Sequence, residues 1–167
     1  MIDPNKKQKA PQAKTPLPSF AEFIAEAQRL KDKAMAVLRE DGHHCPTLIL
    51  YTERGMEIGG IQTSGDRAMH EYVKAIVKAR GAKAFVCVTE SWMVMNLGGV
   101  ATNVRPSLHP DRRECLVVSA VHPLGSRMWA TPFSREHNTI TFGATLDSSA
   151  LGMDLRGGIP EALDREE

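Results

Sequence analysis

Residues 84–95 read AFVCVTESWMVM, and this stretch decides the fold of the chain. Upstream of it, apolar residues recur at helical spacing, whereas within it they follow the period of two that is typical of a β-strand. The stretch therefore predicts a long strand in the middle of a sheet. Alternation places the following residues on one face of that strand: Val86, Val88, Glu90, Trp92 and Val94.

Two helices and a hairpin are predicted before this strand. The first helix spans residues 19–42, because Ser19 and Glu22 form a capping box and apolar residues then recur at helical spacing. The second helix spans residues 64–81 and has a similar apolar face. Between the helices, residues 47–62 have the two apolar runs and the polar turn of a hairpin.

Three further strands follow the central one in close succession, at residues 114–122, 127–133 and 139–144. Their short connections predict an antiparallel meander. We therefore expect an α+β fold with two helices packed on a mostly antiparallel sheet, in the order α-β-β-α-β-β-β-β. This order resembles that of profilin and roadblock modules, which implies a two-layer or α/β/α architecture and no particular activity.

The two ends of the chain differ from this core in composition. Residues 1–18 hold four lysines and four prolines without apolar periodicity, which predicts a flexible basic, proline-rich arm. Residues 147–167 are predicted to form an acidic C-terminal tail. One α+β domain is then expected over residues 19–146. Deletion of residues 1–17 is expected to change the free energy of unfolding by less than about 0.5 kcal/mol.

Overall composition disfavours several classes of protein. The 167 residues include 21 Lys+Arg and 20 Asp+Glu, so the net charge of +1 gives no general attraction to nucleic acid or to a membrane. No apolar run approaches the ~18–20 residues of a membrane span, and the N-terminus lacks the apolar stretch of a signal peptide. The three cysteines have no paired spacing and fit reduced thiols, and Cys87 and Cys115 fall within predicted strands. These features predict a cytoplasmic protein.

The sequence holds no complete cofactor or metal motif. The glycine-rich stretch 59–65 leads into a predicted helix, but it lacks the lysine of a phosphate-binding loop. His43, His44 and Cys45 are consecutive, and adjacent residues rarely bind one metal ion together. Neither a cofactor nor a metal ion is therefore predicted.

The connection 96–113 is the first candidate site. It joins two strongly predicted strands, and connections of this length without structure of their own are often functional. Its second half is rich in charge, whereas Pro106 and Pro110 restrict its freedom. It is either a binding site or only a restrained polar loop. The candidate binding residues are Arg105, Arg112, Arg113 and Trp92.

Two segments carry a resemblance to a family of proteins. They are ESWM at residues 90–93 and PSLHPDRRE at residues 106–114. This pattern resembles a family of uncharacterised bacterial and phage-encoded hypothetical proteins. The resemblance implies a bacterial or phage source and no particular activity.

Glu90 is the second candidate, because its carboxylate lies among valines on the predicted central strand. An unpaired buried charge is strongly unfavourable, so a cationic partner is expected from the segment Arg105–Arg113 or at His122. One interpretation is a structural ion pair that holds the 96–113 connection on the sheet. The other is a general acid or base whose pKa is tuned by burial beside His109 or His122.

Two functions from different classes follow. The lack of a complete catalytic set favours a non-enzymatic protein-interaction or regulatory module of a bacterium or its phage, which binds a protein partner or associates with itself. Nucleic acid is disfavoured, because acidic residues lie among the arginines and aromatic content is only 5%. The alternative is a small hydrolase-like enzyme. Its candidate catalytic residues are Glu90, His109, Asp111 and His122.

Overall fold

The computed structural model describes residues 14–62, 66–94 and 106–150, which contain one antiparallel sheet. The strands lie in the order β2-β1-β3-β4-β5-β6, and β7 also pairs with β5. The sheet thus places β3 in its interior, as the apolar stretch that opens at Ala84 predicts. The strand bounds are β1 (Thr47–Thr52), β2 (Gly55–Gly60), β3 (Ala84–Val94), β4 (Arg112–His122), β5 (Gly125–Glu136), β6 (Thr139–Phe142) and β7 (Leu146–Asp147).

Helix α1 (Phe20–Asp41) begins and ends at the predicted signals. The Ser19 Oγ accepts a hydrogen bond from the Glu22 N–H at 3.3 Å, and the Glu22 Oε2 accepts one from the Ser19 N–H at 2.9 Å. At the other end, Gly42 has a φ of 75°, a left-handed conformation that favours glycine, and its N–H donates to the Leu38 carbonyl. The capping box is therefore confirmed.

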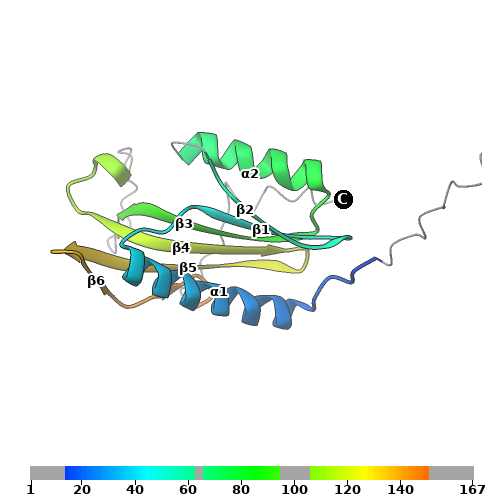
Figure 1. Ribbon diagram of the computed structural model, residues 1–167, viewed down its shortest axis with the longest axis horizontal. Coiled ribbons are helices and arrows are strands. Elements are labelled where there is room, and N and C mark those ends of the chain that lie inside the picture. Colours follow the sequence, from blue (N-terminus) through cyan, green and yellow to red (C-terminus); the bar gives the residue numbers. More distant parts are fainter. Residues whose placement is uncertain (1–13, 63–65, 95–105, 151–167) are drawn as a thin grey trace, which may run out of the picture.

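The two helices cover opposite faces of the sheet (Figure 1). Helix α1 packs Phe23, Ala27 and Leu38 on one face, against β1, β3, β4, β5 and β6. Helix α2 (Asp66–Arg80) packs Val73 and Val77 on the other face, against β1 and β3. Neither described helix is long and apolar enough to cross a membrane. The α+β class with two helices on an antiparallel sheet is confirmed, as is the predicted order of its elements.

The exposure of the side chains changes along β3. Alternate residues face the two helices: Val86 and Val88 belong to the α1 core, and Cys87 belongs to the α2 core. The strand is fully buried from Ala84 to Thr89, and Trp92 further along is 42% exposed. The carboxyl end of β3 therefore leaves the core, and it does so beside the start of β4.

The N-terminal boundary of the domain needs a correction. Residues 14–18, which the sequence assigns to a flexible arm, lie against the domain. The Thr15 N–H donates to the Glu53 carbonyl at 2.9 Å, and Leu17 packs on the α1 core. These contacts favour a loss of stability when residues 14–17 are removed, because buried apolar surface stabilises the fold, and the effect of deleting residues 1–17 stays a prediction. Residues 1–13 lie outside the described residues.

The C-terminal boundary also moves. Asp147, which the sequence assigns to the acidic tail, belongs to β7 and lies opposite Trp129 of β5. Ser148 follows it and is buried. The domain therefore continues beyond residue 146. A two-residue strand has too little apolar periodicity to be recognised in the sequence, and only its side chains show why it pairs. Residues 151–167 lie outside the described residues.

Candidate functional site

A row of side chains crosses the α1 face of the sheet where β3 leaves the core. Trp92 of β3 lies opposite Glu114 of β4. On the neighbouring strands, Phe133 of β5 lies opposite Glu114 on one side and opposite Phe142 of β6 on the other. Directly opposed residues of antiparallel strands share a face. Four strands thus bring three aromatic rings and one carboxylate into a line.

Arginine side chains lie over the three rings of this row. The distances from the guanidinium carbon to the ring centre are 5.0 Å for Arg112 and Trp92, 5.0 Å for Arg135 and Phe133, and 5.2 Å for Arg39 and Phe142. A guanidinium at this distance is attracted to the negative face of the ring. The stacking therefore holds the cationic groups in place and reduces the conformational entropy that they would lose on binding a ligand.

The row borders a depression of about 540 Å³. Its most chemically distinctive lining residues are here called the Trp92 surface, and they are Trp92, Arg112, Arg113, Glu114, Phe133, Arg135 and Phe142. Of the four predicted binding residues, Trp92 and Arg112 are brought together on the α1 face, whereas Arg113 also lines the depression but lies opposite Met93, on the other face of the sheet. The fourth, Arg105, lies outside the described residues. The sequence analysis did not identify Phe142, because the residues of β6 do not indicate which strand β6 will pair with.

Glu90 is paired, but with a different cation from the predicted one. Its carboxylate accepts hydrogen bonds from the Arg135 guanidinium and from the backbone N–H of His44. The Arg135 Nε also lies 3.3 Å from both carboxylate oxygens of Glu114. The need for a partner is thus confirmed, whereas the predicted partners Arg112, Arg113 and His122 are not among the described contacts of Glu90, and Arg105 lies outside the described residues. The prediction considered cations that are near Glu90 in the sequence. In the sheet, the Arg135 side chain of β5 instead reaches Glu90 of β3 across the intervening strand β4.

The arginines of the Trp92 surface differ in their partners. Arg135 is shared between Glu90 and Glu114. Among the described residues, no carboxylate lies within ion-pair distance of Arg112 or Arg113. The Arg112 guanidinium has only a long contact of 3.5 Å with the His109 carbonyl besides its ring. Arg112 shares the α1 face with Trp92, whereas Arg113 lies opposite Met93 and is on the other face of the sheet. The row beside Trp92 therefore presents one positive charge, that of Arg112, which the described part of the domain does not neutralise.

The four candidate catalytic residues do not meet. Glu90 lies opposite Leu116 in β4, whereas His122 is at the far end of that strand, about 20 Å away at the usual rise of a strand. His109 and Asp111 lie before β4, where the His109 Nδ1 is 4.0 Å from the Asp111 carboxylate. The polar pocket expected of the hydrolase-like alternative therefore does not form around these four residues in the described structure.

His122 has a structural place instead. It is 6% exposed and its ring lies 5.5 Å from that of Phe20 and 5.2 Å from that of Phe23. Its Nδ1 accepts a hydrogen bond from the Leu124 N–H at 3.2 Å, and its Nε2 lies 3.2 Å from the Pro18 carbonyl. A neutral ring with its proton on Nε2 satisfies both contacts. His122 thus connects the start of α1 to the β4–β5 turn.

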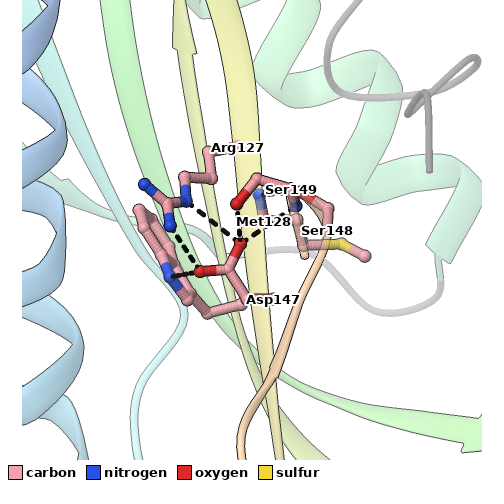
Figure 2. Close-up of polar contacts among 6 residues, drawn as sticks. Arg127, Met128, Asp147, Ser148 and Ser149 are labelled. Atoms are coloured by element: carbon pink, nitrogen blue, oxygen red, sulfur yellow. Dashed lines mark hydrogen bonds and ion pairs between the residues drawn. The ribbon is translucent and has the colours of Figure 1, made fainter. Parts of the chain in front are cut away.

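A second polar cluster joins β5 to β7 and was not foreseen from the sequence (Figure 2). The Asp147 carboxylate accepts hydrogen bonds from Arg127 at 3.0 and 2.6 Å, from the Trp129 indole at 3.0 Å, and from Ser149 at 3.0 and 2.8 Å. The bonds from Arg127 hold the pKa of Asp147 well below its usual range. The Ser148 hydroxyl accepts a further bond from the Met128 N–H at 2.9 Å. This arrangement is closed, since both carboxylate oxygens are occupied by donors of the chain.

The thiols and histidines offer no second site. Burial raises the pKa of Cys87 to about 12 and that of Cys115 to about 11, so both remain protonated and pack as core residues, as the sequence predicts. Cys45 is exposed beside His44. Among residues 14–62, 66–94 and 106–150, no group of three or more His, Cys, Asp or Glu side chains is arranged to hold a metal ion.

Comparison with protein-family models, with curated proteins and with solved structures gives no match for this chain.

Proposed function

We propose that the protein is a non-enzymatic interaction module that binds an acidic segment of a partner protein at the Trp92 surface. One observation carries this proposal. Arg112 lines a depression and stacks on an exposed tryptophan, and no carboxylate of the described residues pairs with this arginine. An acidic segment of a partner protein would supply a carboxylate of opposite charge at this position.

The side chains of this surface are those that contribute most to protein interfaces. Tryptophan and arginine are enriched among the residues that dominate binding energy. Trp92 is 42% exposed and offers a large apolar area, and Arg112 stacks on it at 5.0 Å. A planar guanidinium can bind a carboxylate through two parallel hydrogen bonds. An Asp or Glu side chain of the partner would therefore bind Arg112 while its neighbouring apolar residues cover the Trp92 ring.

The acidic residues of the surface leave this positive character in place. Glu114 and Glu90 both bind Arg135. These three residues form a local ion-pair network, so Glu114 is turned toward Arg135 and away from competition for Arg112. The charge of Arg135 is thereby neutralised, whereas the charge of Arg112, at the start of β4, is not paired with any described carboxylate.

Tryptophan fluorescence tests the proposal directly, because Trp129 is only 3% exposed and Trp92 is the accessible one of the two tryptophans. An array of acidic peptides with interleaved apolar residues is screened with the full chain. Peptides that bind should protect Trp92 from quenching by acrylamide, and their affinity should fall as salt rises. In isothermal titration calorimetry, which does not depend on Trp92 fluorescence, Arg112→Ala and Trp92→Ala should each weaken binding about tenfold or more, which corresponds to ~1.4 kcal/mol or more at a binding hot spot.

Leu124→Ala is the matched control, since Leu124 is 76% exposed but lies at the opposite end of β4. It should bind the selected peptides as the unmodified chain does. Equal binding by Trp92→Ala would contradict the proposal. Tighter binding of a single-stranded oligonucleotide than of any acidic peptide would also contradict it, because the surface would then bind bases stacked on Trp92 beside Arg112.

A further inference from the structure

Strand β2 forms one edge of the sheet, far from the Trp92 surface. It pairs with β1 on its inner side, and no strand of the described residues pairs with its outer side. Edge strands are usually protected by lysine, proline or a bulge. The sequence of β2 is GMEIGG, which contains neither residue, and its register with β1 is continuous. As far as the described residues go, the edge is therefore open to another strand.

The hydrogen-bonding pattern of the hairpin shows which backbone groups face outward. The Ile61 N–H donates to the Pro46 carbonyl at 2.8 Å, in continuation of the register that pairs Thr47 with Gly60. In an antiparallel pair, hydrogen-bonded and non-hydrogen-bonded positions alternate. Alternate residues of β2, beginning at Gly60, therefore direct their N–H and C=O groups away from β1. These residues are Met56, Ile58 and Gly60.

Two of these residues also expose large apolar side chains. Ile58 lies opposite Ile49, a member of the α1 core, so Ile58 is on the α1 face of the sheet, and Met56 shares that face. The exposed fractions are 65% for Ile58 and 56% for Met56. Glu57 points to the other face, where its carboxylate lies 3.5 Å from Arg80. The edge thus combines open backbone groups with an apolar face and a paired charge.

We infer that β2 pairs antiparallel with β2 of a second copy of the chain, about a two-fold axis at Ile58. An interface of this symmetry needs a surface that is complementary to itself. With the axis at Ile58, the outward groups of Ile58 pair with those of Ile58 in the second copy. The outward groups of Met56 then pair with those of Gly60. All the outward-facing backbone groups of the strand are thereby satisfied.

The side chains favour the same register. Ile58 lies beside Ile58 of the second copy, Met56 lies opposite a glycine, and Glu57 lies opposite Gly59. Nothing lies within 4 Å of the position that a Cβ would occupy at Gly59, so this space is open to the facing side chain. An axis at Glu57 would instead place two carboxylates directly opposite each other, and facing like charges are destabilising. Glycines at 59 and 60 thus make β2 complementary to itself when the axis passes through Ile58.

Sedimentation of the full chain tests the association. The unmodified protein should sediment as a dimer. Ile58→Pro, which removes an outward N–H and keeps the hydrogen bonds to β1, should sediment as a monomer with an unchanged circular dichroism spectrum. Ile58→Lys should do the same by the charge that it places at the edge. Leu124→Lys, a substitution of an exposed leucine in the β4–β5 turn, should remain a dimer. A monomeric unmodified chain, or a dimeric Ile58→Pro chain, would overturn the inference.

Cysteine cross-linking tests the register and is carried out in a Cys45→Ser background, because Cys45 is the exposed native thiol. Ile58→Cys should form a disulfide between copies on mild oxidation, since a directly opposed pair has Cα atoms about 5.5 Å apart, within the range of a disulfide. Glu57→Cys should not, because its two positions then lie diagonally, beyond about 7 Å. Cross-linking of Glu57→Cys without that of Ile58→Cys would contradict an axis at Ile58.

Discussion

The protein uses an arginine stacked on a tryptophan twice, with opposite consequences. Arg127 lies 5.3 Å from the centre of the Trp129 ring, and Asp147 binds both side chains. Arg112 lies 5.0 Å from the centre of the Trp92 ring, and no described carboxylate joins this pair. The first tryptophan is 3% exposed and the second 42%. One added carboxylate therefore turns a stacked pair into a closed structural link, and without it the Arg112 guanidinium has no ion-pair partner among the described residues.

The largest expected effect is on the closed pair. Asp147→Ala should lower the free energy of unfolding by about 2–3 kcal/mol, because it leaves a half-buried guanidinium and a buried indole N–H without an acceptor. Urea unfolding followed by Trp129 fluorescence measures this. The control is Asp111→Ala, since the Asp111 side chain is 86% exposed and should cost less than about 0.5 kcal/mol. Equal losses for both variants would show that Asp147 contributes no more than an ordinary surface charge.

Acid unfolding tests the same contribution of the Asp147 carboxylate to stability. The pKa of Asp147 is lowered in the folded state, chiefly by its hydrogen bonds with Arg127. The resulting stability is present above the unfolded pKa of about 3.9 and is lost as the pH falls toward the lower folded value. Between about pH 5 and pH 2, the unmodified chain should therefore lose more stability than Asp147→Asn does. Parallel curves for the two proteins would contradict a low pKa for Asp147.

A smaller effect is expected at Glu90, which lies at the margin of the open surface. Glu90→Gln should cost about 1–2 kcal/mol, since the amide can still accept from the His44 N–H but no longer neutralises Arg135. In a double-mutant cycle, Glu90→Gln and Arg135→Met should show a coupling energy above ~0.5 kcal/mol. Glu90→Gln and Arg113→Ala should be additive. Coupling to Arg113 in place of Arg135 would restore the partner that the sequence suggested.

The titration of His44 should change the free energy of unfolding by less than the Glu90→Gln substitution does. Burial lowers the pKa of His44 below its ordinary value, and the nearby Glu90 charge raises it in part. The folded protein therefore binds a proton at His44 less readily than the unfolded chain, and stability falls as the pH decreases below about 6.5. Glu90→Gln should steepen this fall, because the opposing charge is removed. Chemical unfolding between pH 7 and pH 5, with His44→Asn as the variant that should flatten the curve, measures the effect.

The smallest change in stability is expected at the open pair itself. Arg112→Ala should leave the free energy of unfolding within about 0.5 kcal/mol, because its guanidinium has no described ion-pair partner and lies at the surface. The comparable Arg127→Ala should cost at least 1 kcal/mol more, at about the strength of a charged hydrogen bond. Thermal and urea unfolding of the two variants compare these values. A large loss for Arg112→Ala would make its stacking on Trp92 structural.

The elements of the fold could be predicted from the sequence because their causes are local. The capping box at Ser19 and the left-handed Gly42 set the ends of α1, and the period-two pattern from Ala84 identifies β3. The candidate site was predictable only in part. Trp92, Arg112 and Arg113 stand out by residue type at a strand end and in a long connection, whereas Arg135 meets Glu90 only because β5 lies beside β4.

The sequence by itself determined the class of the fold, the helix ends and which residues of β3 face each helix, since these depend on periodicity and capping between near neighbours. Tertiary structure alone decided the partners of the charged groups. Glu90 and Arg135, like Arg127 and Asp147, are joined across strands, and ion pairing has no sequence period to show it. Two similar arginines thus acquire different roles because the strand beside one carries a carboxylate, and the strand beside the other leaves its tryptophan exposed.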